Sequence, residues 1–325
     1  MSAILFPAFT WNIMRHPNHF LICLGLTVAA GSWGLYWLPQ RFLEGYGLTG
    51  GWGTIAQMGI ALLVLSPLAL WRAIRGKRTG LEFPIIGFLM GGGYACYANS
   101  FLLTEVMRAL MLFFLIPFWT TLFERIFLGK RFGLSRLMSL VLAFAGLWIV
   151  LARDFFLPIP ENWGDWLALL GGCFFAGGAL RLQEVKSKSV QPILFAFFLY
   201  GTLATLGLSS LLTAELGPMP SAGSLLSMAP WLFLLSVGFF IPTNTIILWS
   251  PSRIGAGLFS ILILSEVVVG TVSAGLLADD PFGWREGLGG ILILLAGLVE
   301  TIFSPGSTED IESDFKERER SLEGI

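Results

Sequence analysis

The sequence predicts an all-α integral membrane protein, and three observations indicate this fold class. Of the 325 residues, 55% are hydrophobic and only 13% are charged, and the mean hydropathy is +0.77. A soluble domain carries about 25% charged residues, so this chain has too little polar surface to cover a water-exposed globule. The apolar residues form long runs without strand-like alternation, which argues against an outer-membrane barrel.

Each helix that crosses a bilayer needs about 20 mostly apolar residues. Ten such runs are found, at 19–39, 50–70, 83–103, 105–124, 134–152, 163–183, 191–213, 229–250, 253–278 and 284–303. Because residues 1–14 contain no Lys or Arg, we interpret the first run as a retained span and not as a signal peptide. The sequence therefore predicts ten transmembrane helices.

The basic residues predict the orientation of these helices. If residues 1–18 are cytoplasmic, sixteen of the 20 Lys and Arg residues fall on inner segments, three fall outside and Arg108 lies within a span. An excess of positive charge on the cytoplasmic side is typical of membrane proteins. We expect both termini to be cytoplasmic, including the charged tail 304–325.

The two halves of the chain resemble each other weakly. Residues 132–147 read FGLSRLMSLVLAFAGL and residues 282–298 read FGWREGLGGILILLAGL. Each half, 19–152 and 153–303, holds five predicted spans, and an odd number makes the second half enter the membrane from the opposite side. Inverted repeats of this kind are typical of secondary transporters. Shared apolar composition is the alternative explanation.

Two stretches resemble the conserved halves of EamA-type members of the drug/metabolite transporter (DMT) superfamily. They run from Glu105 to Leu151 and from Ser265 to Glu300, and the Trp33-Gly34 pair is similar to an early signature of that family. The resemblance implies two inverted five-helix repeats around a central cavity. It also implies metabolite export across the inner membrane.

The chain departs from the family pattern in three places. Lys130 follows Leu128-Gly129 where the family usually has a glutamate, and Asp279 and Asp280 stand near that position in the second half. Pro117 matches the mid-span proline, but Ser265-Glu266 occupies the corresponding point of the second half. Glu266 is thus the individual feature of this sequence.

Glu266 lies near the middle of the ninth predicted span. A bare carboxylate at that depth costs several kcal/mol, so it must be protonated, paired or facing water. We interpret it as a substrate-binding residue that also exchanges a proton. A structural glutamate bonded between helices is the alternative.

Arg108 lies one turn inside the outer end of the fourth span, three residues after Glu105. Its guanidinium could bind a carboxylate, phosphate or sulfonate of the substrate with two hydrogen bonds. Pairing with Glu105 near the headgroups is the alternative. Facing one cavity, Arg108 and Glu266 would hold the two ends of a zwitterion such as an amino acid.

Aromatic and amide side chains complete the candidate substrate site. Trp33, Tyr94 and Tyr97 lie deep enough to stack on an aromatic or cationic ligand, and membrane-interface positions are the alternative. Asn244 follows Pro242, which frees backbone carbonyls. We nevertheless expect in-span amides such as Asn244, Gln57 and Asn99 to join helices.

Together these features predict a secondary transporter that moves a small organic metabolite by alternating access. We expect export of an amino-acid-like, zwitterionic, aromatic or cationic compound with proton coupling, and uptake or exchange is the alternative. A membrane-embedded lipid-modifying enzyme would need clustered acid–base or metal-binding residues, and only His16 and His19 are present as histidines. We predict no cofactor, metal or nucleic acid. The expected partners are the substrate, the lipid bilayer and protons.

Overall fold

The computed structural model describes residues 17–49, 51–75, 80–129, 133–151, 160–184, 190–211, 219–250, 253, 262–277 and 283–303. Every regular element in these ranges is a helix. An all-α protein is therefore confirmed for the described part of the chain.

Helices of the first half follow the predicted spans. They are α2 (Pro17–Trp33), α3 (Trp37–Gly45), α4 (Trp52–Ile74), α5 (Glu82–Ser100), α6 (Val106–Phe113), α7 (Ile116–Leu128) and α8 (Leu134–Leu151). The second half has α9 (Trp163–Glu184), α10 (Gln191–Leu211), α12 (Ala222–Phe233), the π-helix η1 (Leu234–Phe240), α13 (Ile241–Trp249), α16 (Ser265–Leu277) and α17 (Trp284–Phe303).

Six of the helical segments are long and apolar enough to cross a membrane. They are Leu21–Gly45, Trp52–Ile74, Val106–Phe127, Trp163–Leu182, Gln191–Leu211 and Ala222–Trp249. Helices also occur within the other four predicted spans, as α5, α8, α16 and α17. The membrane character of the chain is clear, and the number ten stays a prediction.

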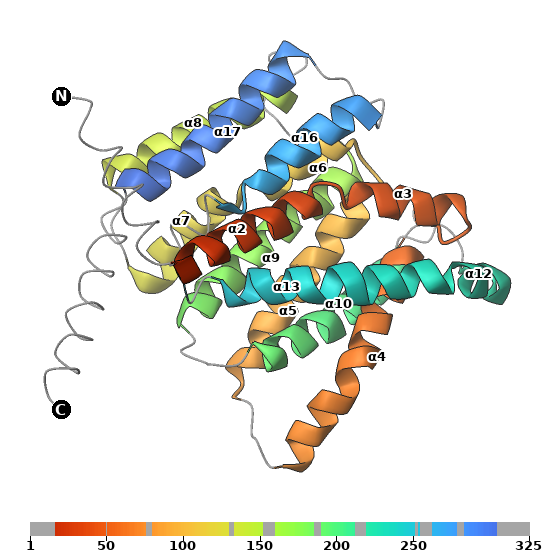
Figure 1. Cartoon of the computed structure of the whole chain (residues 1–325). Coiled ribbons are helices and arrows are strands. Elements are labelled where there is room, and N and C mark those ends of the chain that lie inside the picture. Colours follow the sequence, from red (N-terminus) through yellow and green to blue (C-terminus); the bar gives the residue numbers. More distant parts are fainter. Residues whose placement is uncertain are drawn as a thin grey trace, which may run out of the picture.

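The helices pack mainly against partners from the other half of the chain (Figure 1). Helix α5 lies against α9 and α10, and α16 lies against α2 and α6. Helices α8 and α17 run side by side along one edge of the molecule. The core is therefore built between the halves.

Three predicted spans are interrupted within the described residues, which continuous apolar runs do not reveal. The first span breaks between α2 and α3, where the amides of Gly34, Leu35 and Tyr36 bond to carbonyls three residues earlier. The ninth span has a turn at residues 263–264, directly before α16. The fourth span breaks between Phe113 and Ile116. Pro117 explains this break, because a proline has no amide hydrogen to donate to the Phe113 carbonyl.

Glycines allow the closest helix contacts, and the Gly91–Gly93 and Gly171-Gly172 groups are an example. A Cβ atom at Gly93 would lie 2.9 Å from the Gly171 carbonyl oxygen, and one at Gly171 would lie 2.8 Å from the Gly93 oxygen. Helices α5 and α9 thus touch through their backbones, which only residues without a Cβ permit.

Gly34 sets a second backbone contact, between the α2–α3 turn and α16. A Cβ atom there would lie 2.5 Å from the Glu266 carbonyl oxygen and 2.6 Å from the Gly270 nitrogen. We expect Gly34→Ala to lower the free energy of unfolding by about 1–3 kcal/mol, because backbone must move to admit the methyl group. Thermal unfolding of purified protein in detergent measures the effect.

Gly25→Ala is the matched control, because a Cβ atom at Gly25 in the same span meets nothing within 4 Å. We expect this control to unfold at the wild-type temperature or slightly above it. Equal destabilisation by the two substitutions would contradict the tight contact at Gly34.

Candidate substrate site

Glu266 is buried at the start of α16, with 5% of its surface exposed. Its Oε1 accepts a hydrogen bond of 2.5 Å from the hydroxyl of Tyr97 on α5. Two residues that the sequence nominated separately, from opposite halves of the chain, are therefore in direct contact.

The α2–α3 turn holds α16 in this position. Besides the close approach of Gly34, the Trp37 indole nitrogen donates to Ser273 Oγ at 3.1 Å. Ser273 Oγ in turn donates to the carbonyl of Gly270 in its own helix at 3.0 Å. Gly34 and Trp37 thus join the α2–α3 region to the Glu266 helix, the first through its backbone and the second through its indole ring.

A group of buried aromatic rings lies near Tyr97 and Glu266. Trp33 is 5.2 Å from Tyr94 and 5.3 Å from Phe240, measured between ring centroids. Tyr36 is 5.3 Å from Phe240 and stacks on Phe239 at 6.4 Å. We call Trp33, Tyr36, Tyr94, Phe239 and Phe240 the aromatic group; its members come from α2, the α2–α3 turn, α5 and η1.

Three polar atoms of the aromatic group are buried without a hydrogen bond of standard geometry to any described residue, although the Tyr36 hydroxyl lies near those of Tyr94 and Thr54. They are the Trp33 indole nitrogen and the hydroxyl oxygens of Tyr36 and Tyr94. Buried polar atoms normally have partners, and an unpaired one costs about 1–3 kcal/mol. Such atoms are what a bound ligand or ordered water would satisfy.

Tyr97 connects the aromatic group to α6. Its ring stacks on Phe113 with centroids 4.0 Å apart, and it meets Phe101 edge-on at 4.6 Å. Tyr97, which donates to Glu266, therefore packs against the end of α6, next to the break at Pro117.

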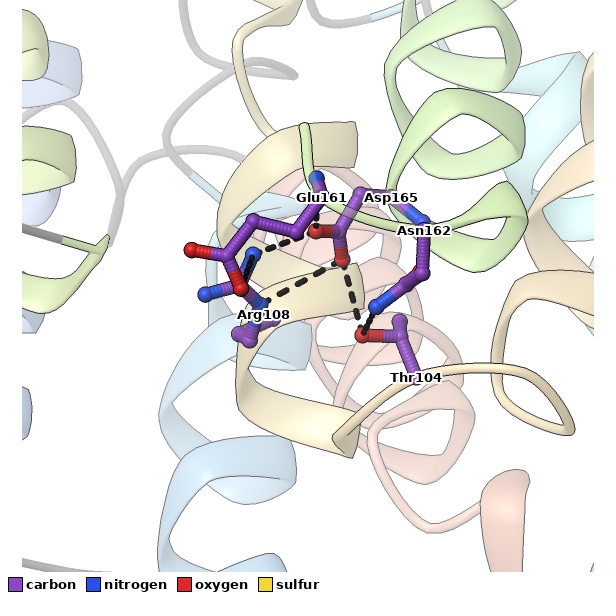
Figure 2. A network of polar contacts seen from close by, with 5 residues as sticks. All are labelled: Thr104, Arg108, Glu161, Asn162 and Asp165. Atoms are coloured by element: carbon purple, nitrogen blue, oxygen red, sulfur yellow. Dashed lines mark hydrogen bonds and ion pairs between the residues drawn. The ribbon is translucent and has the colours of Figure 1, made fainter. Parts of the chain in front are cut away.

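Arg108 has a buried partner that the sequence analysis did not find (Figure 2). Its Nη2 pairs with Asp165 Oδ2, and its Nε donates to Asp165 Oδ1 at 3.3 Å. Thr104 donates to the same Oδ1 at 2.7 Å, and the Glu161 amide donates to Oδ2 at 3.0 Å. Arg108 and Asp165 are 5% and 0% exposed.

From the sequence we predicted that Arg108 pairs with either Glu105 or an anionic group of the substrate. Asp165 instead takes the Nε–Nη2 edge of the guanidinium in a bidentate pair, and Glu161 Oε2 lies 3.5 Å from the same Nη2. Asp165 escaped notice because it stands near the beginning of an apolar run, where an acidic residue reads as an interfacial one. Only the packing of α6 on α9 reveals the pair.

Asn244 bonds within its own helix. Its Nδ2 donates to the Phe240 carbonyl at 2.9 Å, while Thr243 donates to the Phe239 carbonyl at 2.6 Å. These side chains satisfy carbonyls near the junction of η1 and α13, where Pro242 offers no amide hydrogen. Asn244 thus lies beside the aromatic group and supports the backbone there.

A separate polar cluster joins α3, α4 and α5. Gln40 Nε2 donates to Thr54 Oγ1 at 2.6 Å, and Gln57 Nε2 donates to Gln40 Oε1 at 3.2 Å. All three residues are buried. The prediction that Gln57 joins helices is confirmed. Gln40 was missed, because it follows the apparent end of the first span.

Comparison with known proteins agrees with this architecture. Residues 20–152 match the model of the EamA-like transporter family, which belongs to the DMT superfamily. This part of the chain is an EamA domain. The family consists of membrane transporters. No curated protein matches the sequence.

Sixteen chains of solved structures also match. One, described only as the crystal structure of a protein, aligns with a TM-score of 0.54 and 17% identity over 86% of this chain and 98% of its own. At that identity the likeness shows the fold alone. The EamA match ends at the boundary between the two predicted repeats, so the second repeat stays a prediction.

Within the ranges that the structure describes, no three His, Cys, Asp or Glu side chains gather in a way that could hold a metal ion. Asp279, Asp280 and Lys130, which mark departures from the family pattern, lie outside the described residues. The candidate site therefore consists of one carboxyl group, its tyrosine partner and the aromatic group.

Tyr97→Phe tests whether the hydrogen bond to Glu266 contributes to stability. We expect a loss of about 1–3 kcal/mol in the free energy of unfolding, because a buried carboxyl group would be left without its partner. Thermal and denaturant unfolding in detergent measure the loss.

Tyr94→Phe is the matched control on the same helix face. The Tyr94 hydroxyl makes no hydrogen bond of standard geometry among the described residues and lies near only the Tyr36 hydroxyl, so its removal should cost less than the loss of the Tyr97–Glu266 bond. If Tyr94→Phe were the more damaging substitution, the assignment of polar partners at this site would be wrong.

Proposed function

We propose that the protein is a secondary transporter that moves a small organic cation across the inner membrane by alternating access. The observation that carries this proposal is the buried Glu266 carboxyl group next to aromatic rings with unpaired polar atoms. An ionisable residue within a transmembrane segment marks a substrate or proton pathway by default. A carboxylate facing aromatic rings suits a positively charged nitrogen.

The choice between a cation and a zwitterion depends on Arg108. A zwitterion would need a free guanidinium for its carboxylate, and the Arg108 fork is directed at Asp165. Glu266 bonds only to a neutral tyrosine hydroxyl among the described residues, so its charge has no basic partner there. Amines and quaternary ammonium compounds with a flat apolar part are therefore the favoured substrates.

Helix contacts support an inverted repeat. If the predicted spans are counted in order, most contacts reappear when each span is exchanged for the one five positions away. The pair α5–α9 becomes α13–α2, α5–α10 becomes η1–α4, and α6–α9 becomes α16–α2. The pairs α4–α10, α8–α17 and α6–α16 map onto themselves. Two interlocked halves of this kind can rock about a central site.

Proton exchange at Glu266 would couple this movement to the membrane gradient. The ionised carboxylate binds the cation, and a proton taken up from the outside displaces it. The Glu266 carboxylate thus carries either the substrate cation or a proton whenever the protein changes between its two forms. This keeps the cost of burying the carboxylate low. Export and cytoplasmic termini follow from the family resemblance and from the basic residues on the predicted inner segments.

Reconstituted protein tests the function. We expect liposomes loaded with a mixture of small amines, quaternary ammonium compounds, amino acids and neutral metabolites to release the cations selectively when the external pH is lowered. Mass spectrometry of the external solution identifies the compounds. Glu266→Gln should remove the dependence on the pH gradient, because it cannot exchange a proton.

Glu82→Gln is the matched control, since Glu82 is an exposed carboxylate at the start of α5. It should transport like the wild type. Selective release of amino acids or neutral compounds, or an unchanged pH dependence in Glu266→Gln, would overturn the proposed substrate class or coupling.

Trp33 provides a second test, of cation recognition by the aromatic group. We expect Trp33→Leu to raise KM for a transported cation by about tenfold, the size of a desolvated cation–π contact of about 1–2 kcal/mol. Trp231→Leu is the control, because Trp231 is 52% exposed. Initial rates over a range of substrate concentrations separate KM from kcat. An equal KM in the two variants would exclude a role for Trp33 in binding.

A further inference from the structure

We propose that Arg108 and Asp165 form a polar gate at the outer end of the protein, which closes the path between the outer solution and Glu266. The gate rests on the proposed alternating access, and it adds the contact that must break for the outer side to open.

The gate joins a helix of the first half to a helix of the second half, near the beginning of each. Arg108 is the third residue of α6 and Asp165 is the third residue of α9. The positive-inside orientation places both helix beginnings on the outer side of the membrane. Thr104 lies just before α6, and Glu161 and Asn162 lie just before α9, so the whole network lies at this end of the two helices (Figure 2).

The chemistry of the gate suits repeated opening. In the closed form, Asp165 accepts from Arg108, Thr104 and the Glu161 amide. Asn162 Nδ2 donates to Thr104 Oγ1 at 3.2 Å, so Thr104 connects Asn162 to Asp165. The Glu161 side chain is 66% exposed, so water reaches the rim of the network. On opening, both charges can be hydrated there, which a pair buried at the bilayer centre could not achieve.

Helix α6 connects the gate to the substrate site. Phe113, which stacks on Tyr97, lies five residues after Arg108, a distance of about 7.5 Å along the helix axis. The Phe113 carbonyl touches α9 where Gly172 leaves room for it. A separation of α6 from α9 would therefore uncover the side of Tyr97 that Phe113 now covers.

The contact related by exchange of the halves lacks such a pair. Helix α2 contains no Lys, Arg, Asp or Glu, and its contact with α16 includes a hydrogen bond of 3.1 Å from Ser265 Oγ to the Thr27 carbonyl. Charge thus holds only the outer of the two equivalent contacts. The ion pair biases the protein toward the form that is closed to the outside.

A cysteine reporter tests the gate without any substrate. Ser100 is fully buried and is the last residue of α5, one turn beyond Tyr97 at the predicted outer end of the helix. In a background where Cys23, Cys96 and Cys173 are replaced by alanine, Ser100→Cys is exposed to a membrane-impermeant thiol reagent. The reagent is applied to proteoliposomes of sorted orientation, and labelling is followed by mass spectrometry.

We expect Asp165→Asn to raise the labelling rate from the outer side by about tenfold or more, because it removes the interaction that favours the closed form. Arg108→Lys keeps the charge but loses the fork geometry, so it should raise the rate by a smaller factor. Glu44→Gln is the matched control, because Glu44 lies near the predicted outer end of α3 and makes no side-chain contact with the gate among the described residues. It removes an acidic charge on the same predicted side of the membrane and should label like the parent.

An unchanged labelling rate in either Asp165→Asn or Arg108→Lys, when that variant is folded, would overturn the proposed gate. Arg108→Lys keeps the test decisive where Asp165→Asn does not fold, and an unfolded sample is recognised by its lost thermal transition. Because the readout needs no transported compound, a failed gate is distinguishable from a failed substrate assignment. A rate raised equally by Glu44→Gln would also overturn the proposal, since the effect would then come from surface charge and not from the Arg108–Asp165 pair.

Discussion

Within a bilayer each polar group must find its partner inside the protein, and the described structure follows from this constraint. Backbone groups are satisfied by helices, and the carbonyls near η1 are satisfied by side chains such as Thr243 and Asn244. Arg108 is satisfied by Asp165. The polar atoms of Trp33 and the two tyrosines of the aromatic group are among the buried atoms that lack a partner of standard geometry in the described part of the chain, and their aromatic rings pack against one another, so together they define the candidate site.

Small residues make this satisfaction possible. Where Gly93 meets Gly171, and where Gly34 meets α16, the backbones approach so closely that side chains on neighbouring turns can reach across. In lipid, van der Waals packing and hydrogen bonds must hold helices together, because burying apolar surface gains little there. The Tyr97–Glu266 and Trp37–Ser273 bonds both depend on these close contacts.

The three charges that define the two polar centres have different surroundings. Arg108 and Asp165 neutralise each other near the predicted outer surface, where separation and rehydration are feasible. Glu266 has only a neutral donor among the described residues, and it lies where its helix meets the first half of the chain. A charge-paired contact is suited to opening and closing, whereas an unpaired carboxyl group is suited to a cationic ligand. The different roles proposed for the Arg108–Asp165 pair and for Glu266 therefore follow from the partner of each charge and from its depth in the membrane.

Hydropathy alone determined that the chain is a helical membrane protein, because so many long apolar runs cannot be covered by polar residues in a water-soluble fold. The apolar runs also located the helices, and the Trp33-Gly34 and Glu266 positions pointed to the site. Tertiary structure alone decided that Arg108 pairs with Asp165, that Glu266 bonds to Tyr97, and that Phe239 and Phe240 join the aromatic group. These contacts join residues far apart in the sequence, so they depend on which helix faces pack together. Apolar helices carry almost no periodic signal from which those faces could be read.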